Sequence, residues 1–331
     1  MLAARRVATE SGCGFKVECK LSYSLAEVNA SALSQGRDDA TRVRERRAAR
    51  QKCLGWANKG INLTHGFGVG EGTGTLETGG WCLDARAAPR TPCRGGSWCT
   101  VNLPNQMSYD LPPGHLAADS VVIRLLVGVL SICDDGRECF GRPGWESGCS
   151  CSVMRSLSVL DLGAGVGQYG RALLSKSSRH RYRGLDGAGN VEEVTDGFVR
   201  FADLTKPLAT PRADWVLSTE VGEHIPTPLE PAFVRNLHAH ACRGIILSWA
   251  VPGKWGIGHT NTHTPSYLAH IFQELGYLLD VNATSYLRWR HGRAHAVVDE
   301  RRNVSQPWKW LRSAQVFRRI TPFRSPECTL E

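Results

Sequence analysis

Residues 158–167 read S-V-L-D-L-G-A-G-V-G, a short apolar run that contains one acid and breaks into alternating glycines. The apolar positions up to Leu162 suit a buried strand of a parallel sheet. Gly163, Gly165 and Gly167 allow the backbone to turn sharply and to approach a ligand closely. A helical pattern follows directly, so the stretch predicts a strand–turn–helix unit with a ligand at the turn.

The glycines alone do not decide which ligand binds, because residues 165–170 also satisfy G-x-G-x-x-G, a pattern of dinucleotide sites. Asp161 lies at the end of the predicted strand, just before the first glycine. A pyrophosphate there would meet a like charge, whereas an ammonium and a sulfonium would be attracted by the carboxylate. The acid favours S-adenosylmethionine, and a NAD(P)-dependent oxidoreductase is the alternative.

Two further acids follow the next predicted strands. Residues 180–185 suit a second strand that delivers Asp186, whose carboxylate can accept both hydroxyls of a ribose. Residues 197–202 suit a third strand that ends at Asp203 and Leu204, where an acid and an apolar side chain can meet an adenine amino group. Successive strands therefore each present one part of a nucleoside site.

The glycine turn, Asp186, Asp203 and the segment after a fourth predicted strand, 213–218, resemble the successive motifs of class I S-adenosylmethionine-dependent methyltransferases. The resemblance covers roughly residues 115–320. It implies an α/β fold, a Rossmann-like seven-stranded sheet with helices on both faces and an antiparallel last strand at 314–318, between strands five and six. It also implies that the turn holds the methionine part of the cofactor, with the two acids on ribose and adenine.

The rest of the chain continues the alternating pattern. It predicts helices at 229–241, 266–275 and 282–290 and strands at 244–249 and 278–281. The longest apolar run, 121–132, is too short to cross a bilayer and contains Arg124, so we expect a core helix capped by Asp119 or Ser120 and no membrane span.

The fourth strand is followed by Glu220, Glu223 and His224, in the form E-V-x-E-H. On a helical turn these three residues share one face. The segment is similar to one in ubiquinone-pathway O-methyltransferases and small-RNA 2'-O-methyltransferases, where the resemblance implies a divalent ion such as Mg²⁺. His259 or His263 is then a candidate for the fourth ligand. The alternative is an acidic turn without metal, in which His224 acts as general base beside Glu223.

We expect direct in-line methyl transfer to an oxygen of a small-molecule substrate, and the E-V-x-E-H resemblance keeps RNA 2'-O-methylation as the alternative. The chain has a formal net charge of +9 and a pI near 9.1, which permits a nucleic-acid partner. Arginine-dense stretches at 42–50 and 288–293 suit phosphates, but the remaining excess charge is scattered, which does not favour nucleic acid.

The cysteines divide the chain, because ten of the twelve precede residue 152. Their spacings lack paired C-x-x-C units, so disulfides are favoured over a zinc ribbon. Disulfides and four N-x-[ST] sequons suit a secretory lumen, whereas residues 1–30 contain no hydrophobic signal core and suit the cytoplasm. The compartment stays open between these two.

Composition predicts the domain organisation. We expect a poorly ordered Arg/Gly-rich, Cys-bearing extension at 1–75, a small Cys/Trp-containing cap at 76–114 and a methyltransferase domain at 115–320. Within that domain, the polar residues 133–156 form a predicted inserted loop, and 321–331 form a tail.

Overall fold

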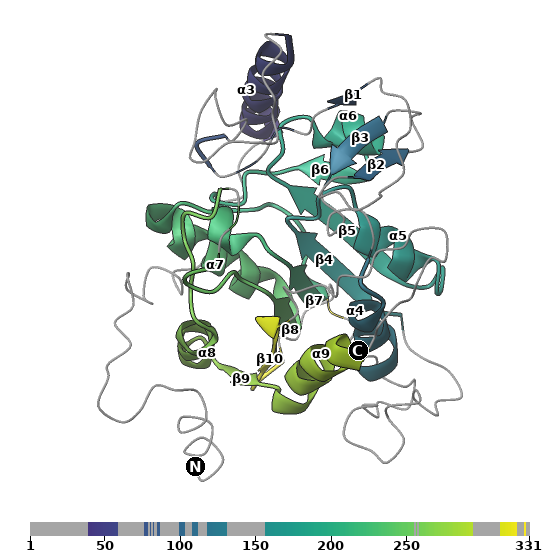
Figure 1. Cartoon of the computed structure of the whole chain (residues 1–331), viewed down its shortest axis with the longest axis vertical. Coiled ribbons are helices and arrows are strands. Elements are labelled where there is room, and N and C mark those ends of the chain that lie inside the picture. The colour runs from purple at the N-terminus through teal and green to yellow at the C-terminus, as the bar shows by residue number, and fades with distance from the viewer. Residues whose placement is uncertain are drawn as a thin grey trace.

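The apolar run that precedes the glycines forms β4, an interior strand of a seven-stranded sheet in the order β6-β5-β4-β7-β8-β10-β9 (Figure 1). Its strands are β4 (Ser158–Leu162), β5 (Arg181–Asp186), β6 (Val199–Phe201), β7 (Ala213–Ser218), β8 (Ala241–Leu247), β9 (Tyr277–Leu279) and β10 (Gln315–Arg319). The first five pair in parallel, and β10 runs antiparallel between β8 and β9. The predicted α/β sheet and its antiparallel last strand are confirmed.

A computed structural model describes the chain in the following segments. They are residues 39–58, 76–78, 80, 82, 85–86, 99–102, 108–111, 118–130, 156–254, 256, 258–293, 312–322 and 328. The predicted inserted loop at 133–156 lies outside the described residues except for its last position.

Helices cover both faces of the sheet because its strands alternate between two hydrophobic clusters. Val159 points into the cluster shared with α4, α5 and α9, whereas Leu160 and Leu162 point into the cluster shared with α7 and α8. The helices are α4 (Ser120–Arg124), α5 (Gln168–Leu174), α6 (Val191–Thr195), α7 (Glu230–His240), α8 (Pro265–Glu274) and α9 (Val281–Arg293). This alternation confirms the two-sided packing predicted for the domain.

The core helix and β8 differ most from the predictions. The core helix begins as predicted, with the Asp119 carboxylate accepting from the Val121 amide at 2.7 Å, but α4 gives way to a π-helix, Leu125–Val129. β8 begins at Ala241, before the predicted position, because it follows the last residue of α7 without a loop. Within the described residues, no helix is long and apolar enough to span a membrane.

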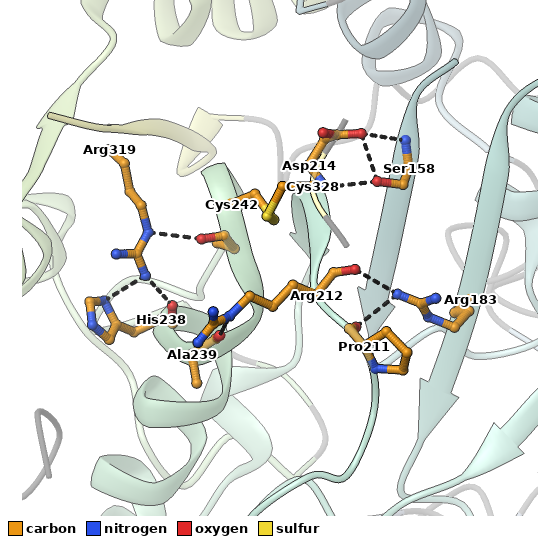
Figure 2. The surroundings of a disulfide bond; sticks show 11 residues. Ser158, Arg183, Pro211, Arg212, Asp214, His238, Ala239, Cys242, Arg319 and Cys328 are labelled. Atoms are coloured by element: carbon orange, nitrogen blue, oxygen red, sulfur yellow. Dashed lines mark hydrogen bonds between the residues drawn. A yellow bond between two sulfur atoms is a disulfide. The ribbon is translucent and has the colours of Figure 1, made fainter. Parts of the chain in front are cut away.

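Arginine side chains close the carboxyl end of α7, where helix carbonyls have no intrahelical partner. Arg319 donates to the carbonyl oxygens of Ala241, at 2.8 Å, and His238, and Arg212 donates to that of Ala239 at 2.8 Å (Figure 2). Burial and the two guanidinium groups lower the pKa of His238 to about 4, so its ring is neutral at physiological pH. The amino-terminal ends of the strands are thus occupied by structural contacts.

A disulfide at the same end joins Cys242 of β8 to Cys328, which lies in the predicted tail (Figure 2). Both cysteines are buried. The crosslink closes a segment of 86 residues and so restricts the unfolded chain. The preference for disulfides is confirmed at this pair.

The structure contradicts the predicted disorder of part of the amino-terminal extension. Residues Asp39–Asn58 form a helix, α3, inside the stretch predicted to be poorly ordered. The prediction was wrong there because α3 is stabilised by contacts with the α/β domain, which leave no local sequence pattern. The predicted cap contains a three-stranded antiparallel sheet in the order β1-β3-β2, built from Ala85–Arg86, Ser108–Leu111 and Cys99–Asn102.

Candidate active site

The glycine turn after β4 has the backbone conformation that only glycine adopts easily. Gly163, Gly165 and Gly167 have φ angles of +85°, +55° and +77°. A Cβ atom on Gly163 would lie 2.1 Å from the Val221 side chain, and one on Gly167 would lie 2.6 Å from the ring of Phe198. The predicted tight turn is confirmed, and its first and last glycines are also required by packing.

Asp161 lies inside the sheet rather than open to the turn. Its carboxylate is almost fully buried and accepts a hydrogen bond from the Tyr182 hydroxyl at 2.8 Å. Burial raises the pKa of Asp161 to about 7, the Tyr182 bond lowers it, and the neighbouring Asp186 raises it further. The sequence predicted a carboxylate that faces the ligand of the turn, whereas the structure buries it against Tyr182, and its charge is partly neutralised by a proton near neutral pH.

Asp186 is the last residue of β5, and its carboxylate links the glycine turn after β4 to the loop after β5. One carboxylate oxygen accepts from the Gly165 amide at 2.7 Å, and the other accepts from the Ala188 amide at 2.8 Å. Each oxygen has a second lone pair, so these bonds are compatible with further donors such as hydroxyls. The structure therefore brings the predicted ribose acid and the glycine turn into direct contact.

Asp203 and Leu204 follow β6 as predicted, and the Asp203 carboxylate has internal partners. One oxygen accepts from the amide and hydroxyl of Thr205 at 3.0 and 2.6 Å, and the other lies 3.0 Å from the Lys206 ammonium. Leu204 is buried. The amide of Ala202 donates to the Asp186 carbonyl oxygen at 2.9 Å, so the segment after β6 lies beside the segment after β5.

Asp119 is a fourth acid close to this turn, as the surroundings of Tyr169 show. Tyr169, in the first turn of α5, is buried among Asp119, Asp161 and Glu220, and burial together with these acids raises its pKa well above the usual value. Burial also raises the pKa of Asp119 and of Asp186. The carboxyl edge of the sheet is therefore strongly acidic, which is the environment that a cationic ligand stabilises.

Beyond β7, Glu223, His224 and His259 each place one potential ligand atom within 4.8 Å of the other two. Glu223 is fully buried, and neither of its carboxylate oxygens has a hydrogen-bond partner among the described residues. Burial and the nearby charge of Glu220 raise the pKa of Glu223 well above its usual value. A buried carboxyl group without a partner is stabilised only by a proton or a cation.

The two histidines of this group are oriented by backbone carbonyls. Nδ1 of His224 lies 3.2 Å from the Gly258 oxygen, and Nδ1 of His259 lies 3.3 Å from the Lys254 oxygen. A carbonyl oxygen can only accept, so Nδ1 donates in both bonds and Nε2 has the lone pair. Metal-binding histidines are commonly held in this way. His259 Nε2 lies 4.0 Å from a Glu223 carboxylate oxygen.

The structure does not bring Glu220 into this group. Its carboxylate accepts from the Ser248 hydroxyl at 3.1 Å and pairs with the Lys254 ammonium at 3.3 Å. The prediction assumed one helical face, but Glu220 has a left-handed φ of +55° and lies outside the short 3₁₀-helix, Gly222–His224. Its side chain therefore does not share a face with those of Glu223 and His224 and pairs with Lys254 instead. The prediction that Glu220 is a metal ligand is wrong.

His263, the other candidate for the fourth ligand, also lies outside the group. Its Nε2 lies 2.6 Å from the carboxylate of Glu230, a buried residue in the first turn of α7. The same carboxylate accepts from the Asn261 side chain at 2.8 Å and the Tyr267 hydroxyl at 2.9 Å. Glu230 thus fixes the segment that follows His259, and His263 has a structural partner rather than a place in the cluster.

Sequence reasoning missed Lys254 and Glu230. Lys254 is a single lysine in a loop, and Glu230 is an acid at a helix start, where such residues are common on protein surfaces. Neither follows a motif. Only the burial of Glu230 and the contact between Lys254 and Glu220 reveal their roles, and both depend on tertiary structure.

No family model matches the chain, and no curated protein matches it. Similar solved structures include magnesium protoporphyrin IX methyltransferase from Synechocystis PCC 6803 with bound S-adenosylhomocysteine, with 21% identity, 38% of this chain and 66% of that chain covered, and a TM-score of 0.31. An amino pentose methyltransferase from Micromonospora echinaspora is also similar, with 14% identity and a TM-score of 0.35. The match covers 50% of this chain and 84% of that chain. Likeness at this level does not assign an activity.

The buried Asp161 carboxyl predicts a specific pH dependence of stability. Because its pKa is about 7 in the folded protein and 3.8 ordinarily, the folded state retains a proton that the unfolded state releases. Stability therefore falls as pH rises from about 4 to about 7. Asp161→Asn removes this effect, and we expect its stability relative to wild type to rise by up to about 3 kcal/mol between pH 5 and pH 8.

Urea unfolding at the two pH values measures this difference. Glu274→Gln, which removes an exposed carboxylate on α8, is the matched control and should show no such trend. A pH-independent difference between Asp161→Asn and wild type would contradict a raised pKa at this site.

Proposed function

We propose that this chain is an S-adenosylmethionine-dependent methyltransferase that transfers a methyl group in line to an oxygen of a small-molecule acceptor. The observation that carries the proposal is the contact between the glycine turn and Asp186, made by the Gly165 amide at 2.7 Å. It lies at the carboxyl edge of a parallel sheet, where ligands of such sheets bind. Asp203 follows the neighbouring strand, so methionine, ribose and adenine would each meet a residue suited to it.

The charge at this edge supports the choice of cofactor. Burial raises the pKa of Asp119, Asp161 and Asp186, so the ionised form of each carboxyl group is disfavoured in the free protein. A positively charged ligand would favour their ionised forms, whereas a pyrophosphate would oppose them. S-adenosylmethionine supplies both the positive charge and the electrophilic methyl group. This argues against the NAD(P)-dependent alternative.

The residues of this chain contribute to the chemistry by positioning the two reactants, by excluding water and by supplying one proton acceptor. His224 has its Nδ1 on the Gly258 carbonyl oxygen, which leaves Nε2 as the atom that accepts a proton. Glu223 is close to this ring and fully buried. We assign His224 the role of general base toward the acceptor hydroxyl, with the buried Glu223 carboxyl group beside it.

A divalent metal ion is the alternative use of this cluster, in which the Nε2 lone pair of His224 ligates the ion instead of accepting a proton. Glu223, His224 and His259 fit such an ion, because they combine a buried carboxyl group and two imidazoles fixed through Nδ1. Two nitrogen ligands favour Mn²⁺, Fe²⁺ or Zn²⁺ over the Mg²⁺ expected from the sequence, since Mg²⁺ prefers oxygen ligands. Such an ion would lower the pKa of a bound hydroxyl. Glu220 is held by Ser248 and Lys254 and is left out of this set.

The arginine-dense stretch at 42–50 favours a small-molecule acceptor over RNA, because two of its arginines pair with acids of the α/β domain. Arg46 pairs with Glu192 and Arg50 with Glu193, both in the first turn of α6. These guanidinium groups therefore serve the packing of α3 on the domain. This one of the two arginine-dense stretches therefore gives no support to the RNA alternative.

We expect isothermal titration to show that the full chain binds S-adenosylhomocysteine and that Asp186→Ala binds it about tenfold to a hundredfold more weakly. The reason is the loss of charge-assisted hydrogen bonds to two ribose hydroxyls. Glu274→Ala, which removes an exposed acid, should bind like wild type. No binding by folded wild type would reject the proposed function, and wild-type affinity in Asp186→Ala would remove Asp186 from the site.

We expect the full chain to bind Mn²⁺ and Glu223→Gln to lose more than about a hundredfold of that affinity, because the only carboxylate of the set is removed. Titration calorimetry with the metal alone measures this. Glu220→Gln should retain most of the affinity, since Glu220 faces Lys254. Equal losses in both variants would restore Glu220 as a ligand, and no loss in either would remove the ion from the site.

A further inference from the structure

One loop of the candidate cofactor site, the loop after β5, is covered by residues that precede the α/β domain. A Cβ atom on Gly80 would lie 2.1 Å from the Gly187 carbonyl oxygen, and one on Gly189 would lie 2.6 Å from the backbone of Ala49 and 2.9 Å from Cys53 Sγ. Gly187 and Gly189 directly follow Asp186, the candidate ribose ligand. We name the covering residues, α3 together with 76–78, 80 and 82, the N-terminal strap.

The strap is held together by a crosslink and a small core of its own. Cys53 of α3 forms a disulfide with Cys82. Both sulfur atoms are buried in a cluster with Ala49 and Leu76, against which Phe201 of β6 packs. The disulfide is thus located between the two halves of the strap and beside the strand that leads to Asp203.

Ion pairs fix the strap to the loops of the candidate adenosine site. Lys206 lies 3.1 Å from Glu45 of α3 and 3.0 Å from Asp203, the candidate adenine ligand. Arg46 and Arg50 pair with acids in the first turn of α6, the helix that follows the covered loop. Figure 1 shows α3 at the same end of the sheet as α6 and β6. Every one of these contacts falls on the adenosine half of the site.

We propose that the N-terminal strap forms the outer wall of the adenosine pocket, and that the Cys53–Cys82 disulfide keeps this wall closed and so sets the affinity for the cofactor. This inference rests on the proposed function, because it takes the ligand of the pocket to be an adenosine derivative. The disulfide fixes the strap in the binding-competent position, and the apparent affinity is proportional to the fraction of molecules that keep that position.

A dithiol reductant reverses the crosslink by transferring two electrons and two protons to it. The products are the Cys53 and Cys82 thiols and the oxidised, cyclic disulfide of the reductant. Two buried disulfides among the described residues, at Cys53–Cys82 and Cys242–Cys328, are typical of an oxidising compartment. In such a compartment the strap is closed, and reduction opens it.

The test compares two double variants of the full chain by titration with S-adenosylhomocysteine. Cys53→Ala/Cys82→Ala removes the strap crosslink, and we expect about a tenfold or greater loss of affinity. Cys242→Ala/Cys328→Ala removes the crosslink at the opposite end of the strands and should bind like wild type. The loss should be equal for 5'-methylthioadenosine, which lacks the amino-acid part, because the strap contacts only the adenosine half.

A second measurement covers the case in which the double variant does not fold. Amide hydrogen exchange of the wild type, with and without dithiothreitol, should show faster exchange of residues 186–206 after reduction, while β7 and β8 remain protected. Unchanged affinity in Cys53→Ala/Cys82→Ala, or unchanged exchange at 186–206 after reduction, would overturn this inference. If wild type binds no S-adenosylhomocysteine at all, the proposed function fails instead.

Discussion

Burial of carboxyl groups at one edge of a parallel sheet is the constraint on which the rest of this structure depends. Asp119, Asp161, Asp186 and Glu223 come from four different segments, and burial raises the pKa of each. Asp119 caps α4, but folding alone does not explain the burial of Asp161 and Glu223, because a buried carboxyl group is less stable as an anion than it would be in water. A positive ligand at this edge gives these acids a common partner.

The geometry around this edge follows from the sheet. Parallel strands deliver their carboxyl ends to one side, so loops that are distant in sequence meet there. Asp186 shows how these loops meet, because its two carboxylate oxygens accept hydrogen bonds from the amides of Gly165 and Ala188, which lie in adjoining loops. The strap contacts the segments that follow β5 and β6, and the cluster around Glu223 follows β7. We therefore regard the nucleoside pocket and the candidate catalytic cluster as parts of one site.

Much of this was predictable from local signals. The glycine turn, the acids after successive strands and the apolar alternation predicted the parallel strands, and the antiparallel place of β10 between β8 and β9 was implied by the family resemblance. Such features depend on backbone conformation and side-chain period, which a sequence displays directly. The proximity of Glu223, His224 and His259 was also anticipated, because two of them are neighbours and the third follows the adjacent strand.

The remaining features depend on contacts between distant segments. Glu220 appeared to share a helical face with Glu223, but its left-handed backbone turns it toward Lys254. His263 was an equal candidate to His259 until Glu230 was seen to hold it. The order of α3 arises from ion pairs with α6 and from the disulfide to Cys82, and none of these partners is adjacent in sequence.

The central claim is that the buried acids serve to bind positive charge, and comparing S-adenosylmethionine with S-adenosylhomocysteine tests it most directly. The two ligands differ in the charged sulfonium and its methyl group, so the ratio of their affinities isolates that charge. Because the pKa of Asp161 is about 7, we predict that the ratio shifts toward S-adenosylmethionine as pH rises from 6 to 8. A ratio that does not change with pH would contradict the account.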